Sequence, residues 1–329
     1  QHLVYRDSSE KLIGAAPLYL KGHSYGEYVF DWGWADAFEK AGQKYFPKLL
    51  SAVPFTPVTC PKLLVHPGED QSEVRSILAS GLVSALQQLN VSSLHINFSS
   101  LDEWEFLGKA KFLKRQGIQY HWNNNGYSSF DDFLNSLTSR KRKAIRKERK
   151  AANESGVNIR FLTGAQIEKR HWDAFFKFYV DTSDRKWGSA YLNREFFTLL
   201  GERMADKVLL IIAEYETTLV GGALNFIGKD TLFGRNWGCL ADFKFLHFEA
   251  CYYRAIDFAI ENGLSRVEAG AQGEHKIQRG YIPTLTYSNH YIDDLGFRDA
   301  VAQFLHRESS YIVEQKAHLD QTTPFRQEQ

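Results

Sequence analysis

The sequence predicts an α/β (α+β) protein with two tandem domains, each containing a mixed sheet flanked by helices. Three observations support this: the length of 329 residues, a strand-rich unit that occurs twice, and hairpins that precede a crossover helix in each copy. A single hydrophobic core stops growing at roughly 250–300 residues, so this length favours two domains. Hairpins followed by one crossover helix give a sheet with both antiparallel and parallel neighbours.

The duplicated unit runs in the order strand, strand, strand, helix, strand, short helix, strand. Its clearest marker is a Trp-Gly dipeptide after an apolar run, at Trp32 in the first copy and at Trp237 in the second. We expect a strand at each dipeptide and a helix after it. In chain order, the matching segments are residues 12–20 and 219–227, 30–33 and 235–238, 45–53 and 251–260, 93–98 and 265–270, and 114–122 and 277–285.

A polar turn at residues 123–126, Asn-Asn-Asn-Gly, separates the copies. We therefore predict a first domain over residues 1–125 and a second over 126–329. The second domain begins with a helical block over residues 130–155 and 166–205, and a last amphipathic helix follows Phe297. The first domain enters a strand pattern directly after its first residue, so we expect that the native beginning of the chain is missing.

The composition excludes several classes of protein. The 40 basic residues nearly balance the 39 acidic ones, so a surface that attracts nucleic acid or membrane must be local. The three cysteines have no CxxC spacing, which argues against a metal site and a disulfide framework and favours a reducing, cytoplasmic setting. Apolar runs such as residues 208–213 are far shorter than the roughly 18 residues of a spanning helix, and we expect no secretory leader.

One local basic surface is evident at residues 139–150, where eight cations stand against one acid. A solvated helix face is one interpretation. The other is a binding site for a phosphate-rich partner such as a nucleotide, coenzyme A or transfer RNA, because closely spaced cations displace the counterions of a polyanion. The run contains no aromatic residue for stacking on bases. The candidate phosphate- or RNA-binding residues are Arg140, Arg142, Arg146 and Arg149.

Two motifs together with the duplication resemble the FemAB-like predicted N-acyltransferases, a bacterial family of peptidoglycan biosynthesis or recognition. The first is the basic segment 139–149 before the second copy, and the second is the Gly-x-x-Gly-x-x-Lys-x-x-Arg-Gly sequence of residues 270–280. Residues 23–32 and 54–58 resemble one bacterial subgroup in particular. The resemblance covers nearly the whole chain.

The resemblance implies two tandem GNAT-like domains, each with a mixed, mostly antiparallel sheet. In this fold two central strands splay apart, and their free backbone groups hold an acyl carbonyl while an amine attacks it. Catalysis then consists of positioning, polarisation of the carbonyl and removal of the ammonium proton. Here the splayed strands would pass through residues 233–237 and 267–270. The implied reaction is transfer of an acyl or aminoacyl group to an amine of a small molecule, a peptidoglycan precursor or a peptide.

The donor implied by the resemblance is aminoacyl-tRNA or acyl-CoA. Coenzyme A users of the fold carry a Gln/Arg-x-x-Gly-x-Gly/Ala loop after the first splayed strand, where backbone amides meet the pyrophosphate. The corresponding residues 242–249 contain no glycine. This favours the FemX-type relatives, which use aminoacyl-tRNA, and transfer RNA would contact the basic helix. No tightly bound cofactor and no metal is expected. The alternative is a non-catalytic GNAT-like module that binds a cell-wall precursor or peptide.

The candidate catalytic residues lie in or next to the glycine-rich stretch 270–283. His275 is the candidate proton acceptor, and the acids Glu268 and Glu274 are the other candidates. Lys276 and Arg279 are candidate clamps for a phosphate or carboxylate. Surface-loop chemistry is the alternative for this stretch, but its three glycines favour a constrained turn against a ligand.

The other candidate substrate-binding residues are aromatic, amide or charged side chains. Some lie near the splayed strands, some in an acidic and aromatic group of the first copy suited to an amine-bearing acceptor, and some in the helical block. The alternative for the aromatic ones is a place in the core. The candidates near the splayed strands are Asn236, Trp237 and Tyr281. Those of the first copy are Glu27, Tyr28, Asp31 and Trp34, and those of the helical block are Arg185 and Trp187.

Overall fold

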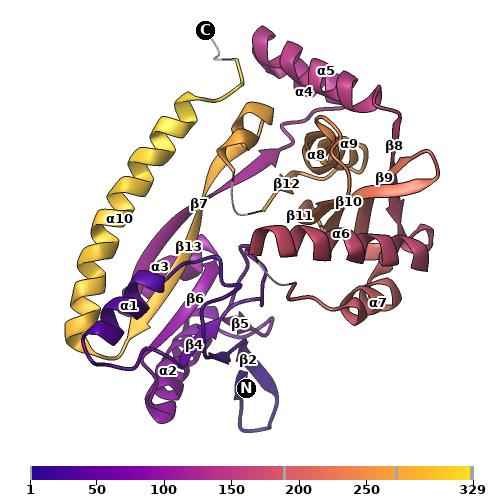
Figure 1. Ribbon diagram of the computed structural model, residues 1–329. Coiled ribbons are helices and arrows are strands. Elements are labelled where there is room, and N and C mark those ends of the chain that lie inside the picture. The colour runs from indigo at the N-terminus through magenta and orange to yellow at the C-terminus, as the bar shows by residue number, and fades with distance from the viewer. Residues whose placement is uncertain (1, 188–189, 271–272, 327–329) are drawn as a thin grey trace. The chain divides into compact units, whose positions relative to one another are not determined.

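The computed structural model describes residues 2–187, 190–270 and 273–326, except the side chains of Lys186 and Trp187 (Figure 1). The chain forms two compact units. Unit 1 comprises Gln1–Gln119 and Thr284–His318, and unit 2 comprises Tyr120–Pro283 and Leu319–Gln329. Within the described ranges, every helix is too short or too polar to cross a membrane.

Unit 1 contains a three-stranded sheet of order β1-β2-β5 and a larger sheet of order β3-β4-β6-β13-β7. The strands are β1 (Leu3–Arg6), β2 (Leu12–Ala16), β3 (Tyr19–Lys21), β4 (Lys48–Ser51), β5 (Leu64–Val65), β6 (Ser93–Ser99), the first part of β7 (Leu113–Asn123) and most of β13 (Ile282–Ile292). The helices are α1 (Trp32–Lys40), α2 (Gln71–Leu89), α3 (Leu101–Lys109) and most of α10 (Leu295–Gln321).

Helix α2 is the crossover between the parallel strands β4 and β6. It begins where the Asp70 side chain accepts a hydrogen bond from the Glu73 amide, and it ends at Asn90 in the left-handed conformation. Its buried residues, including Leu78, Leu82 and Leu86, form the main core of the unit with one face of the sheet. A fold with a mixed sheet and a crossover helix is therefore confirmed for this unit.

Unit 2 contains a sheet of order β7-β12-β11-β10-β9-β8, to which β7 contributes its end. The strands are β8 (Val157–Thr163), β9 (Val208–Tyr215), β10 (Thr218–Ile227), β11 (Thr231–Cys239) and β12 (Arg266–Glu268). The helices are α4 (Phe130–Ser136), α5 (Ser139–Asn153), α6 (Lys169–Trp187), α7 (Arg194–Arg203), α8 (Leu246–Phe248) and α9 (Arg254–Glu261). A π-helical turn, Glu249–Tyr253, joins α8 to α9.

The helical block of unit 2 starts and stops where the sequence predicts. The Ser129 hydroxyl accepts a hydrogen bond from the Asp132 amide at the start of α4, and α5 ends shortly before Gly156, whose φ is +81°. The block is two helices instead of one, because the chain is extended at Leu137 and Thr138. Helix α6 packs on β10 and β11, and its aromatic residues fill the core of the unit.

The compact units differ from the predicted domain ranges. The first unit ends at Gln119 instead of residue 125, and it also contains Thr284–His318. Strand β13 pairs with β6, which brings together His95 and His290, 195 residues apart in the chain. Helix α10 then packs against α1 in a shared apolar cluster. Local pattern cannot reveal such a return of the chain, because it shows only neighbours in sequence.

The predicted alignment of the two copies agrees with the element order in its second half and is wrong at the Trp-Gly dipeptides and at residues 45–53. By element order β6 corresponds to β12 and β7 to β13, as expected. However, Trp32 begins helix α1, whereas Trp237 lies within strand β11, and residues 48–51 form a strand instead of part of a helix. The crossover helix of the first copy is α2. The shared Trp-Gly dipeptide is thus not a structural equivalence.

Candidate active site

The central strands β11 and β12 of unit 2 form a fork. They pair in parallel over three residues only, Thr231 with Arg266, Leu232 with Val267 and Phe233 with Glu268. Strand β12 ends there, while β11 continues to Cys239 and keeps its antiparallel partner β10 on the other side. Among the described residues, the edge of β11 that faced β12 therefore has no strand partner beyond Phe233. This confirms the predicted splayed pair.

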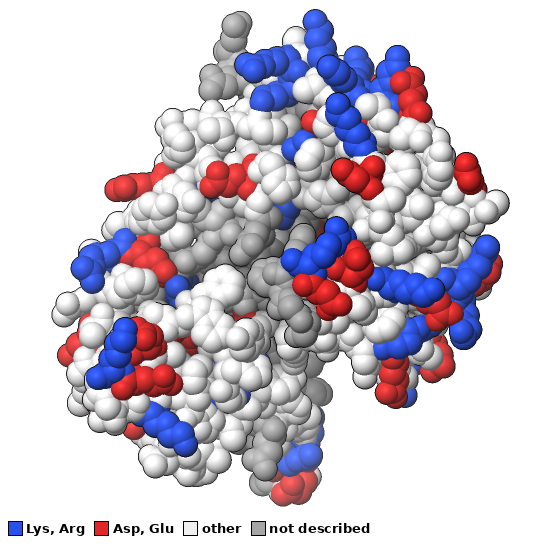
Figure 2. Space-filling view, in the orientation of Figure 1, with Lys and Arg blue, Asp and Glu red and all other residues white. Residues whose placement is uncertain are grey.

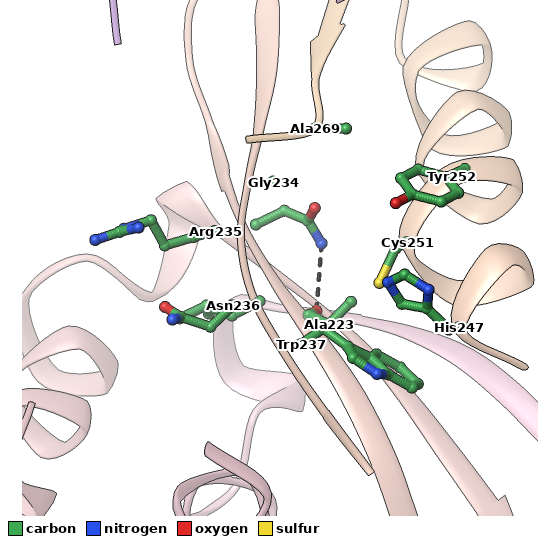
Figure 3. Close-up of a pocket in the computed structure, with 11 residues that line it drawn as sticks. Ala223, Gly234, Arg235, Asn236, Trp237, His247, Cys251, Tyr252 and Ala269 are labelled. Atoms are coloured by element: carbon green, nitrogen blue, oxygen red, sulfur yellow. Dashed lines mark hydrogen bonds between the residues drawn. The ribbon is translucent and has the colours of Figure 1, made fainter. Parts of the chain in front are cut away.

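A pocket of about 100 Å³ opens at this fork (Figure 3). Ligand pockets for complete small molecules measure roughly 300–1,000 Å³, so this pocket is too small for a whole nucleotide. Strands β10, β11 and the residue after β12 form one part of its wall, and the α8–α9 segment forms the other. It is lined by Ala223, Leu224, Asn225, Gly234, Arg235, Asn236, Trp237, His247, Cys251, Tyr252 and Ala269.

Strand β11 is irregular where it lines the pocket. Leu224 pairs with Asn236 and the next residue, Asn225, pairs with Gly234, so Arg235 is an extra residue in the ladder. Such bulges re-aim side chains and are common next to active sites. The Asn225 amide is held by the carbonyls of Leu209 and Ala223, the second of which is the dashed line in Figure 3. The pocket floor is therefore fixed by side chain to backbone bonds.

Gly234 lies at the point where the fork opens. A Cβ atom there would lie 3.2 Å from the Glu268 carbonyl oxygen and 3.4 Å from Asn225 Oδ1. Because Gly234 has no side chain, the backbones of β11 and β12 can approach closely before they diverge.

Tyr252 lines the pocket and is hydrogen-bonded to His275, which is exposed and lies behind Tyr252 rather than in the lining. The distance from Tyr252 Oη to His275 Nε2 is 2.9 Å. Burial raises the pKa of Tyr252, so its hydroxyl stays protonated and can donate. Burial, together with Arg279 and Lys276, lowers the pKa of His275, so its imidazole is neutral at neutral pH and can accept. The pair can move a proton from the pocket to the imidazole.

Lys276 is buried and holds the loop after β12. Its ammonium group donates to the carbonyls of Ala269 at 2.7 Å and of Gly270 at 3.1 Å. Burial lowers its pKa to about 8. Its partners are therefore backbone carbonyls beside the pocket, in place of the phosphate or carboxylate that the sequence suggests.

The lowered pKa of Lys276 has a consequence for stability. Between pH 8 and 10.5 the unfolded chain binds more protons at this residue than the folded chain does, so its contribution makes the free energy of unfolding rise with pH. We expect Lys276→Met to remove this rise. The measurement is urea unfolding of wild type and variant at several pH values from 7.5 to 10. Parallel curves for the two proteins would contradict the assignment.

Most other candidates from the glycine-rich stretch are engaged within unit 2. The Arg279 guanidinium pairs with Glu148 at 3.0 Å and lies 3.5 Å from the centre of the Phe248 ring. Tyr281 is fully buried, and its hydroxyl is 3.4 Å from the Tyr252 carbonyl oxygen. Glu274 is exposed in the 3-10 turn. Arg279, Tyr281 and Glu274 are therefore outside the pocket lining, and only the first two are held by buried contacts within unit 2.

Glu268 is buried at the end of β12 but does not line the pocket. Its carboxylate is 3.6 Å from the Arg266 guanidinium and 3.9 Å from His121 Nε2. Burial raises the pKa of Glu268 and lowers that of His121 to about 3, so the histidine is neutral and the second contact is not an ion pair. Asn236 and Trp237 do line the pocket, and the Trp237 ring is 5.5 Å from that of His247.

The acidic group of unit 1 binds a cation of the protein itself. The fully buried Lys48 ammonium donates to Glu27 at 2.9 Å, to Ser24 at 2.7 Å and to Asp31. Asp31 also accepts from the Tyr45 hydroxyl at 2.7 Å. Where the sequence suggests an amine-bearing acceptor, the structure thus has an internal ammonium.

Two aromatic candidates lie beside this acidic group. Trp34 is buried against the His290 ring, with the centres of the two rings 4.9 Å apart. Tyr28 has a positive φ of +58° in the segment that leads to α1. Trp34 is therefore part of a core rather than an open wall.

The gap between the parallel strands of unit 1 is closed by its own chain. After Ser51, β4 leaves β6, and the Phe98 carbonyl oxygen accepts hydrogen bonds from the Cys60 amide at 3.0 Å and from the Lys62 ammonium at 2.8 Å. Glu103 in turn holds the Lys62 amide. The corresponding strands of unit 2 open onto a pocket instead. This difference places the candidate site in unit 2.

The basic helix α5 presents most of its cations outward, and Figure 2 shows them as a blue group at the top. Arg140 and Arg146 are exposed, with Arg146 paired to Asp131 at 2.9 Å. Arg142 is half-buried, 3.3 Å from Asn135 Oδ1. Arg149 is different, because it pairs with Glu249 at 3.0 Å and Asp257 at 2.6 Å and lies over the Phe130 ring. Its guanidinium holds α5 in place.

Two candidates from the helical block lie at the end of α6. Arg185 is exposed, pairs with Asp181 and donates to the Cys239 carbonyl at 3.1 Å. The side chain of Trp187 is outside the described part of the structure.

Several pocket residues escaped sequence reasoning. Cys251 and Tyr252 come from a segment that reads simply as an amphipathic helix. The position of His247 is explained by the start of a helix as well as by a role in a site. Of these residues, Asn225 alone carries a sequence signal, because it is polar within an apolar strand.

Comparisons with known proteins support this fold. The structure of L-PGS from Bacillus licheniformis is similar with a TM-score of 0.56 and 9% identity, covering 92% of this chain and 89% of that one. The C-terminal domain of a putative lysylphosphatidylglycerol synthetase from Agrobacterium fabrum is similar with a TM-score of 0.56 and 8% identity, covering 94% and 88%. The crystal structure of FemX is similar with a TM-score of 0.53 and 11% identity, covering 92% and 90%.

At such low identity these likenesses show a shared fold. A search among curated proteins finds no sequence match. The sequence model of the FemAB-like family, described as peptidoglycan biosynthesis/recognition, matches residues 1–327. With a GNAT-type fork in unit 2 and a family match over nearly its whole length, the chain belongs to the FemAB-like family.

Proposed function

We propose that the fork in unit 2 is the active site of an aminoacyltransferase or N-acyltransferase. The observation that carries this proposal is the pocket at the unpaired edge of β11, where backbone groups freed from β12 meet the Tyr252–His275 pair. Family membership supports a transferase of peptidoglycan biosynthesis. The closed gap of unit 1 supports a single site.

The proposed reaction forms one amide bond. The amine nitrogen of the acceptor attacks the carbonyl carbon of the donor, the carbon–nitrogen bond forms, and the bond from that carbon to the leaving oxygen or sulfur breaks. Backbone groups of β11 beyond Phe233 orient and polarise the carbonyl. The amine proton passes through the Tyr252 hydroxyl to the neutral imidazole of His275, and the leaving group takes up a proton.

We infer that the donor is aminoacyl-tRNA rather than acyl-CoA. Helix α5 presents exposed cations, among them Arg140, Lys143 and Lys147, as a polyanion would require. The segment between β11 and α9 lacks the glycines that would let backbone amides surround a pyrophosphate. The acceptor that the family description supports is an amine of a peptidoglycan precursor or of a peptide.

The test is a transfer assay with a labelled aminoacyl-tRNA mixture or labelled acyl-CoA and a nucleotide-linked muropeptide. We expect label in an amide product from aminoacyl-tRNA, and weaker binding of transfer RNA as salt rises. The variant Lys143→Glu/Lys147→Glu should weaken RNA binding by about tenfold or more at low salt.

Transfer from acyl-CoA alone, with RNA binding that is flat in salt, would contradict the inferred donor. Muropeptide binding without transfer from any donor would contradict the enzyme and would support a recognition module instead.

A further inference from the structure

The basic helix α5 has an inward face as well as an outward one. Five of its buried or half-buried residues recur at helical spacing: Lys141, Ile145, Glu148, Arg149 and Ala152. Lys141 contacts the Gln278 side chain of the 3-10 turn. The outward face carries the exposed cations, so a partner bound there would act on the rest of unit 2 through the inward face.

Glu148 is the one acid among the cations of residues 139–150, and it faces inward. Both its carboxylate oxygens are 3.0 Å from the Arg279 guanidinium, and it accepts a hydrogen bond from the Tyr253 hydroxyl. Arg279 is only 7% exposed. A buried guanidinium requires a charged partner, because its desolvation is otherwise uncompensated. Glu148 therefore fixes the position of Arg279.

Arg279 in turn contacts the Tyr252–His275 pair. It donates to the His275 carbonyl oxygen at 2.8 Å and lies over the Phe248 ring, which is stacked on Tyr252 with 6.0 Å between ring centres. His275 and Tyr252 are joined by their own hydrogen bond. An unbroken series of contacts therefore runs from Glu148 to the pocket.

A second anchor lies next to the first. Arg149 pairs with Glu249, which is fully buried, and with Asp257. Glu249 begins the π-helical turn that also contains Cys251 and Tyr252 of the pocket. Single π-helical turns are frequent at functional sites, where they shift the register of a helix. Helix α5 is thus held to the segment that forms one wall of the pocket.

From these contacts we propose that Glu148 is a positioning residue that couples the basic helix to the Tyr252–His275 pair. A polyanion bound to the outward cations would stabilise one position of α5, and Glu148 and Arg279 would hold the pair in its hydrogen-bonded geometry. The proposal rests on the proposed function, because it assigns the regulation of that same site by its donor.

The first test compares transfer by Glu148→Gln with transfer by wild type. The matched control is Glu154→Gln, which removes the same charge from an exposed pair with Lys150 at the end of the same helix. We expect Glu148→Gln to lower kcat by about tenfold to a hundredfold, because small displacements of reacting groups have effects of that size. KM for the donor should change little, since the outward cations are intact, and Glu154→Gln should match wild type.

The pH profile separates positioning from a general loss of stability. Without the Glu148 charge, the positive charge of Arg279 acts more strongly on His275. The acidic limb of the kcat profile should therefore move to lower pH in Glu148→Gln. If this variant does not fold, Glu148→Asp, which keeps the charge but shortens the side chain, is measured instead, and it should lower kcat without moving the pH profile. A wild-type kcat and profile in the folded variant would overturn the proposal.

A second readout does not depend on transfer. Unacylated transfer RNA should slow hydrogen exchange in residues 246–261 of wild type and of Glu154→Gln, but not of Glu148→Gln. The same slowing in Glu148→Gln, or none in wild type, would overturn the coupling. If exchange responds as expected while no donor supports transfer, the proposed function fails and the coupling stands.

Discussion

Replacing Lys48 with Met is expected to lower the free energy of unfolding by about 3–5 kcal/mol. The ammonium is fully buried and donates to Glu27, Asp31 and Ser24. Its removal leaves two buried carboxylates with no cation between them, and the cost of an uncompensated buried charge is the largest effect that a single substitution in this cluster can have. The measurement is urea unfolding at pH 7.

The control for this prediction is Lys40→Met, which breaks an exposed pair with Asp36 and should change stability little. A triple variant, Lys48→Met with Glu27→Gln and Asp31→Asn, should recover much of the loss, because it removes the charges as well as their partner. Equal losses for Lys48→Met and Lys40→Met would show that the internal ion cluster contributes nothing to the fold.

The second large effect that we expect is a loss of transfer activity when Cys251 in the pocket is alkylated. Cys251 lines the pocket, and a maleimide attached to its sulfur would occupy the space at the fork. In a Cys60→Ser/Cys239→Ser background we expect alkylation to reduce transfer by about a hundredfold or more, because the donor carbonyl could no longer reach β11. Mass spectrometry gives the extent of alkylation, and the transfer assay gives the activity.

Two controls, one variant and one ligand, make this result specific. Cys251→Ser should keep most of its activity and be insensitive to the reagent, since the thiol has no role in the proposed reaction. Aminoacyl-tRNA should protect Cys251 from alkylation. Full activity after complete alkylation would place the reaction elsewhere in the molecule.

The fold class and the site region follow from different kinds of sequence signal. The order of strands and helices in each copy, together with the glycines of residues 270–280, predicts the fold class and the neighbourhood of the fork. The predicted pairing of the Trp-Gly dipeptides is wrong because Trp32 begins a helix whereas Trp237 lies in a strand, although the two dipeptides are alike in sequence. Short motifs do not determine backbone conformation when the surrounding packing differs.

The charged residues of the basic helix show most clearly what a local sequence pattern cannot predict. Counting cations in residues 139–150 predicts a basic helix, and helical periodicity alone separates Ile145 and Ala152 from the outward positions. The partners of Arg149 and Glu148 are distant in the chain. Asp257 lies 108 residues after Arg149, and Arg279 lies 131 residues after Glu148. A local pattern cannot reveal such pairs. For this reason the sequence suggests Arg149 for phosphate binding, whereas the structure shows that it holds α5 to Glu249 and Asp257.

The sequence by itself determined the two-copy α/β architecture, the family and the existence of a basic helix, because periodicity, turn residues and motifs are local and survive in the order of residues. Only the tertiary structure showed that the corresponding parallel pair of unit 1 is closed by its own chain. In unit 1 the free edge of β6 is taken by Cys60 and Lys62, and the acids Glu27 and Asp31 are neutralised by Lys48. Whether a polar group is available to a ligand depends on partners brought together by folding, and those partners are distant in sequence.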